Sequence, residues 1–250
     1  MPADMFYRRF MEEIRALSLP TDRDFTAKPD WDINLPSFKS VFDAVVNFQH
    51  TAGYRLPSFE QFKRSYFKAI TYTESRAKEY GHLEERESVV HRLWRVYGNF
   101  MLELQVYCYL KEFFEDQNKF GIVITDVIDD IKNKVDMRVI VNSIGGDNKL
   151  FNVNIYSGYN KSERDEEEER RREVEDTVTK THGMAAISNG RDNAVDNIIP
   201  RIDIAMTRDN SQYVNGLRLF RYNFLTETAK EISRIAGHTE DLEPCRPEIF

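Results

Sequence analysis

The fold of this chain is decided by residues 134–158, which read KVDMRVIVNSIGGDNKLFNVNIYSG. β-Branched and aromatic residues recur in two runs of this stretch, 135–141 and 150–158, and such runs are typical of strands. The Gly-Gly-Asp-Asn segment at 145–148 supplies turn-forming residues between them. The stretch therefore predicts a β-hairpin.

The residues before the hairpin predict helices. Apolar residues recur at helical spacing over 83–114 and form one broad apolar face, which makes this the strongest helix signal in the chain. Ser37 and Ser58 are placed to cap two earlier helices, and Gln61 follows Ser58 at the third position, as in a capping box. A short β-branched run at 121–125 predicts one more strand before the hairpin.

Charged and alternating segments follow the hairpin. Residues 163–176 are almost wholly charged, with Glu and Arg spaced for ion pairs at i and i+4, which predicts a solvated helix. Residues 181–197 are expected to form a loop. Alternation predicts strands at 198–206 and 216–222, and a last helix is predicted at 224–235.

This order of elements predicts an α/β fold. We expect a mixed central sheet of about five strands flanked by helices, with an N-terminal helical region in front of it. The expected division is a helical region over 1–82, an α/β core over 83–237 and an irregular tail over 238–250.

Composition is that of a globular protein, because 41% of the residues are hydrophobic. Charges interrupt every long apolar segment, so we expect no membrane span and a cytoplasmic location. Cys108 and Cys245 match neither a disulfide framework nor a zinc-ligand spacing, which favours a reducing compartment. The net charge of -7 disfavours a broad polyanion-binding surface but leaves room for a local one.

Polar side chains of the hairpin suit a hard metal ion. A strand alternates its faces, so Asn154 and Tyr156 project to one side while Val153 and Ile155 project to the other. With Asp136 on the neighbouring strand, the Asn154 side chain is expected within reach of the same ion. Carboxylate and carbonyl oxygens are the ligands that Mg²⁺ takes.

In this layout the hairpin resembles the core of the PD-(D/E)XK nuclease superfamily, whose fold is restriction-endonuclease-like. The resemblance covers about residues 95–225. It implies a Mg²⁺- or Mn²⁺-dependent endonuclease, a phosphodiester hydrolase of a restriction or anti-phage defence system, with DNA preferred over RNA. It also implies that Glu103, on the preceding helix, joins Asp136 and Asn154 as a metal ligand.

The sequence departs from the family's pattern at one position. Tyr156 stands where the pattern has a lysine, and a phenol cannot replace an ammonium that orients the attacking water. Lys161 or Arg164, just beyond the strand, is the candidate substitute. The expected catalytic residues are therefore Asp136 and Asn154, with Lys161 as the provisional replacement.

The same departure supports an alternative function. A nuclease-fold subunit without catalytic activity would act in partner recognition or complex assembly. Its protein partner would bind the charged helix 163–176 or the N-terminal helices. An enzyme of unrelated chemistry on an α/β fold is a third reading, because fold alone does not fix function.

A basic surface with aromatic residues is a further candidate for nucleic-acid binding. Tyr213 and Tyr222 are available to stack on bases, beside the arginines Arg191, Arg201, Arg208, Arg218 and Arg221. These arginines are dispersed along the chain and form no dense cluster. We therefore favour the structural reading, in which Arg218 and Arg221 form the solvated side of a strand.

Overall fold

The computed structural model describes residues 6–36, 38, 56–116, 122–124, 135–142, 148–157 and 200–238. Several predicted features lie outside the described residues: Lys161, the helix expected after Ser37, the charged helix 163–176, the loop 181–197 and nearly all of the tail.

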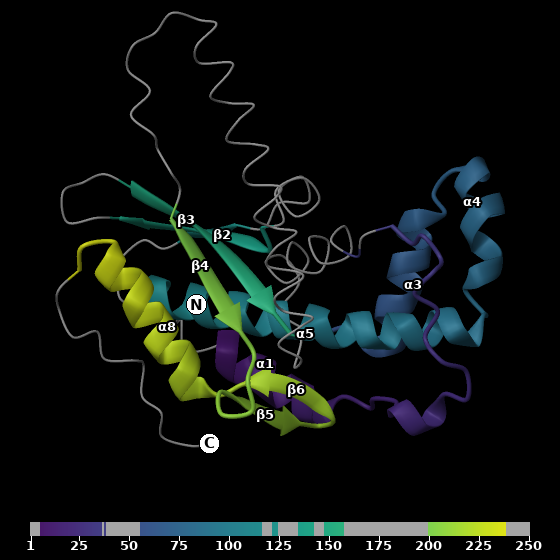
Figure 1. Ribbon diagram of the computed structural model, residues 1–250, viewed down its shortest axis with the longest axis horizontal. Coiled ribbons are helices and arrows are strands. Elements are labelled where there is room, and N and C mark those ends of the chain that lie inside the picture. Colours follow the sequence, from purple (N-terminus) through teal and green to yellow (C-terminus); the bar gives the residue numbers. More distant parts are fainter. Residues whose placement is uncertain are drawn as a thin grey trace, which may run out of the picture.

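The long helix α5 (Glu87–Asp116) organises the described part of the chain. Most of its apolar residues from Val89 to Phe114 are buried. The bounds of α5 confirm the helix predicted over 83–114, apart from its first residues. Figure 1 shows the sheet, α1 and α8 along one half of α5, with α3 and α4 at the other end. This long helix therefore joins the sheet, α1 and α8 to the helices α3 and α4.

A four-stranded mixed sheet lies on α5, formed by β1 (Ile122–Ile124), β2 (Met137–Asn142), β3 (Asn148–Tyr156) and β4 (Arg201–Ala205). The strands follow the order β1-β2-β3-β4 (Figure 1). The first three are antiparallel, which confirms the predicted hairpin, whereas β4 runs parallel to β3. Alternate apolar residues such as Val139 and Phe151 are fully buried and belong to the same core as α5.

The strand predicted at 216–222 does not extend this sheet. It forms β6 (Leu217–Phe220), which pairs with β5 (Ser211–Val214) in a separate two-stranded sheet. The turn between them is Asn215-Gly216, where both residues have positive φ, 49° and 79°. An Asn-Gly turn of this kind favours a tight hairpin between neighbouring strands. The central sheet therefore has four strands among the described residues, and the expected fifth is paired locally.

Gln105 fixes this hairpin to α5. Its side chain donates to the Phe220 carbonyl and accepts from the Phe220 backbone N–H, with both distances 2.9 Å. Its amide nitrogen also lies 3.2 Å from the Tyr7 hydroxyl. All three residues are buried, so one glutamine satisfies the backbone of β6 inside the core.

The N-terminal helix α1 (Phe6–Ala16) packs against α5 and the β5–β6 hairpin. The Asn215 side chain donates to the carbonyls of Ile14 and Leu17 at 2.8 and 2.7 Å. The helix α8 (Tyr222–Ile235) is joined to α5 by a hydrogen bond of 2.7 Å between Tyr109 and Thr226. The helix α1 thus shares a core with elements of the 83–237 region.

At the other end of α5 lie α3 (Phe59–Ile70), α4 (Glu74–Tyr80) and two short 3₁₀ helices, Asp22–Asp24 and Gly81–Leu83. The predicted capping box at the start of α3 is present, because Ser58 and Gln61 exchange side-chain and backbone hydrogen bonds. Within the described ranges, no helix is long and apolar enough to cross a membrane.

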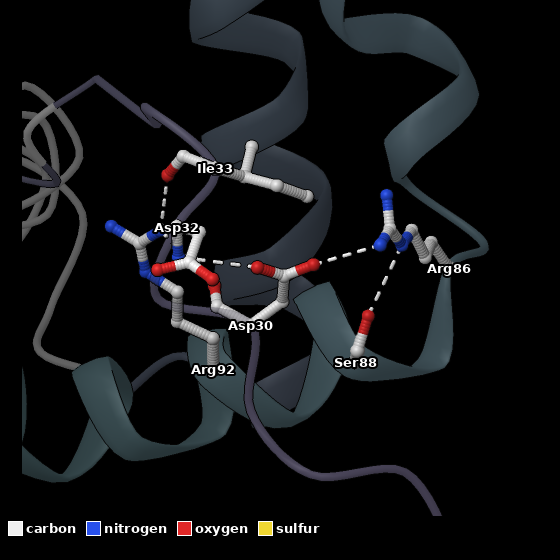
Figure 2. A network of polar contacts seen from close by, with 6 residues as sticks. All are labelled: Asp30, Asp32, Ile33, Arg86, Ser88 and Arg92. Carbon is white, nitrogen blue, oxygen red and sulfur yellow. Dashed lines mark hydrogen bonds and ion pairs between the residues drawn. The ribbon is translucent and has the colours of Figure 1, made fainter.

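A polar network holds the segment before α3 against the start of α5 (Figure 2). Arg86 pairs with the Asp30 carboxylate at 2.7 Å, and its Nε lies 3.2 Å from the Ser88 hydroxyl. Arg92 donates to the carbonyls of Asp30 and Ile33. Because these polar groups are bonded to other groups of the protein, we interpret the network as structural.

Candidate functional site

Parallel pairing of β3 and β4 brings polar side chains together on one face of the sheet. Asn154 lies opposite Asp203 in the register. Its side-chain amide donates to Asp203 Oδ1 at 3.0 Å. Asn154 is only 2% exposed, and its Oδ1 is buried without a hydrogen-bond partner. A buried amide oxygen with no donor is uncommon in folded proteins.

Tyr156 and Arg201 complete this group. Arg201 donates from Nε to Asp203 Oδ1 at 2.8 Å and from a terminal nitrogen to the Tyr156 hydroxyl at 2.5 Å. The Tyr156 hydroxyl also lies 3.3 Å from Asp203 Oδ1. We call Asn154, Tyr156, Arg201 and Asp203 the β3–β4 polar cluster. Three donors from three side chains thus converge on a single carboxylate oxygen.

Asp136 lies just before β2, beside the same part of β3. Since Met137 pairs with Val153, the next position along the ladder places Asp136 next to Asn154. The Asp136 carboxylate is 7% exposed and accepts a hydrogen bond from the backbone N–H of Ile155. The structure therefore brings Asp136 and Asn154 to adjacent positions. The hydrogen bond from Ile155 also gives Asp136 a role in holding the strands together.

Glu103, the third expected metal ligand, is 9% exposed on α5. The described residues contain no group of three His, Cys, Asp or Glu side chains that could hold a metal ion. Glu103, Asp136 and Asp203 therefore do not meet as a three-carboxylate site. The Asn154 side chain lies against Asp203 and next to Asp136 in the strand register, so one amide and two carboxylates come from neighbouring positions. The role of Lys161 stays a prediction, because that residue lies outside the described part of the chain.

Two arginines of the expected basic surface are engaged by their own hairpin. Arg218 donates to the Ser211 hydroxyl and the Thr207 carbonyl, at 2.9 and 2.8 Å. Arg221 donates to the Ser211 carbonyl at 3.0 Å. Tyr222 packs edge-on against Tyr109. These contacts give both arginines a structural role, but they do not form the solvated side of one strand, because Arg218 is half-buried on β6 and Arg221 lies after β6, directly before α8.

Sequence reasoning did not place Asp203 in the candidate site, and it assigned Arg201 to a different surface. The signal for both was the alternation of Arg201 and Asp203 with Ile202 and Ile204, which puts the charged pair on one face of a strand. The alternation did not indicate that this strand, β4, would pair with β3 and so bring Asp203 to Asn154.

Comparison of the chain with family models found no match, and neither did comparison with curated proteins or with solved structures.

Proposed function

We propose that this protein is a Mg²⁺- or Mn²⁺-dependent phosphodiester hydrolase acting on DNA, with a divergent restriction-endonuclease-like site. The observation that carries the proposal is the buried Oδ1 of Asn154, which has no hydrogen-bond partner although the amide nitrogen of the same side chain donates to Asp203. An acceptor in this position is satisfied by a hard cation or by water. The residues present therefore fit a divalent metal ion.

Asp136, Asn154 and Asp203 would hold the ion in this proposal. The amide oxygen of Asn154 binds a hard cation less tightly than a carboxylate does, and the Asp203 carboxylate adds the charge that Asn154 lacks. A bound Mg²⁺ or Mn²⁺ would supply the Lewis acid that activates water and offsets charge on the phosphate. The resemblance implies a role for Glu103 on α5 as well, which makes Glu103 a further target for mutation.

The architecture supports this proposal at a coarser level. A mixed α/β sheet follows a long helix that carries Glu103, as the resemblance implies. The preference for DNA, and the placement in restriction or anti-phage defence, come from the resemblance alone.

A second candidate function is favoured by one contact. The ion pair of 2.8 Å between Arg201 and Asp203 already neutralises the carboxylate, and Tyr156 occupies the position of the family's lysine. An inactive nuclease-fold subunit that recognises a partner would keep such a closed pair. Its partner would be a protein bound through the N-terminal helices or the segment 163–176.

DNA cleavage assays distinguish the two functions. The wild-type protein would be incubated with supercoiled DNA, single-stranded DNA and RNA, each with Mg²⁺, Mn²⁺ or EDTA. Asp203→Asn and Asp136→Asn test the site, and Asp209→Asn is a matched control, because Asp209 is exposed in the turn after β4. Metal-dependent cleavage that Asp209→Asn keeps and the other two variants lose supports the hydrolase. Absence of cleavage by the wild-type protein favours the inactive subunit.

A further inference from the structure

The β3–β4 polar cluster contains its own cation. The Arg201 side chain is 17% exposed, pairs with Asp203 two residues along β4 and reaches across to Tyr156 on β3. A divalent cation at Asp203 and Asn154 must share the carboxylate with this guanidinium. Two positive charges beside one carboxylate repel each other, so metal binding weakens the pair between Arg201 and Asp203.

We infer that Arg201 is a resident counter-ion that a divalent metal ion releases, and that the released guanidinium then binds a phosphate group of the substrate. This inference rests on the proposed function, because it uses the same metal site. Guanidinium groups bind phosphate oxygens through two parallel hydrogen bonds, which a lysine ammonium does not do. Arg201 would thereby supply the positive charge that Tyr156 does not.

The consequence is positive coupling between metal and phosphodiester. In the metal-free protein, the Arg201 guanidinium pairs with the Asp203 carboxylate. With the metal ion in place, the negative phosphate would bind the Arg201 guanidinium and offset the repulsion between the guanidinium and the metal ion. Coupling between two binding sites is reciprocal, so each ligand raises the affinity for the other by the same factor. Such a device keeps the Asp203 carboxylate of the β3–β4 polar cluster charge-balanced until both ligands are present.

The inference gives Arg201→Gln opposite effects on the two ligands. Removing a resident cation leaves the carboxylate of Asp203 more available, so Mn²⁺ alone should bind the variant at least as tightly as it binds the wild-type protein. The phosphodiester should lose its partner. A merely structural role for Arg201 predicts weaker binding of both ligands, because the cluster would lose its geometry.

The experiment is a titration of the whole chain with Mn²⁺, followed through the electron paramagnetic resonance signal of the free ion. Titrations would be run with and without a thymidine dinucleotide, and a neutral methylphosphonate analogue serves as the uncharged control. We expect the dinucleotide to tighten Mn²⁺ binding to the wild-type protein about fivefold or more, and the analogue to have no such effect. In Arg201→Gln the dinucleotide should have no effect. Arg234→Gln, which removes a guanidinium from the exposed Arg234–Glu231 pair of α8, should behave as wild type.

Three results would overturn the inference: a wild-type protein that binds Mn²⁺ without coupling to the dinucleotide, coupling that persists in Arg201→Gln, or weaker Mn²⁺ binding by that variant when it is folded. Circular dichroism verifies folding. If Arg201→Gln does not fold, Arg201→Lys keeps the charge without the planar fork and should reduce the coupling while leaving Mn²⁺ affinity near the wild-type value. A wild-type protein that binds no Mn²⁺ refutes the proposed metal site itself, which separates that failure from a failure of the coupling.

Discussion

Replacing Asp136 with alanine is expected to lower the free energy of unfolding by about 2 kcal/mol even when no metal is present. The reason is the hydrogen bond that the Asp136 carboxylate accepts from the backbone N–H of Ile155. Both residues are buried, so alanine leaves that N–H without an acceptor. A hydrogen bond to a charged group contributes about 1.5–3 kcal/mol, and an orphaned buried donor costs about 1–3 kcal/mol.

Asparagine at position 136 separates this structural role from a metal-binding role. Its side-chain carbonyl can still accept from Ile155, so Asp136→Asn should lose less than about 1 kcal/mol, as expected for a neutral bond replacing a charged one. Urea unfolding of both variants in EDTA, followed by circular dichroism, measures the difference. Equal losses in the two variants, or no loss in Asp136→Ala, would contradict a stabilising hydrogen bond between Asp136 and Ile155. The result also decides which variant is the sound one for cleavage assays.

Three further predictions concern the core, the capping of α3 and alkaline pH. Gln105→Met should lower the free energy of unfolding by about 3 kcal/mol, because two buried backbone groups of Phe220 lose their partners. Gln212→Met, at an exposed position of β5, is the control and should change it by less than about 0.5 kcal/mol in the same urea titration. Ser58→Ala should cost about 1 kcal/mol by removing the capping box of α3, measured as a lower unfolding midpoint with an unchanged slope. Burial raises the pKa of Tyr7 to about 12, above its value of about 10 in the unfolded chain. The stability that the neutral Tyr7 contributes is therefore present below pH 10 and lost as the pH rises to 12. Tyr7→Phe should reduce this alkaline loss of unfolding free energy by about 2 kcal/mol, measured by unfolding experiments across that pH range.

Local sequence signals predicted much of the fold. The β-branched and aromatic runs at 135–141 and 150–158 predicted β2 and β3, and helical periodicity predicted α5. Ser58 and Gln61 predicted the start of α3, and the structure has the expected capping box. Each of these signals depends on residues close together in the chain, and the structure follows them closely.

The candidate site was only half predictable, for a physical reason. Asp136 and Asn154 are joined by a hairpin, so their proximity follows from one turn and one register. Asp203 reaches Asn154 through parallel pairing of strands that are far apart in the sequence. No local pattern specifies such a pairing, because it depends on how the whole sheet is assembled.

The expected fifth strand was assigned to the central sheet because its apolar alternation fits any half-buried strand. The Asn215-Gly216 dipeptide was the missed signal, since it directs β6 to pair with β5. Gln105 then satisfies the backbone of Phe220 from α5, a contact between residues too distant in sequence for a local pattern to reveal.

The most direct test of the central claim is a Mn²⁺ titration of the wild-type protein beside Asp203→Asn and its matched control Asp209→Asn. We predict one bound Mn²⁺ per chain. Its affinity should fall about tenfold or more in Asp203→Asn, since removing a charged ligand costs well over 1 kcal/mol, and should be unchanged in Asp209→Asn. No binding by the wild-type protein, or equal affinity in all three proteins, would contradict the claim that Asn154 and Asp203 form a metal site.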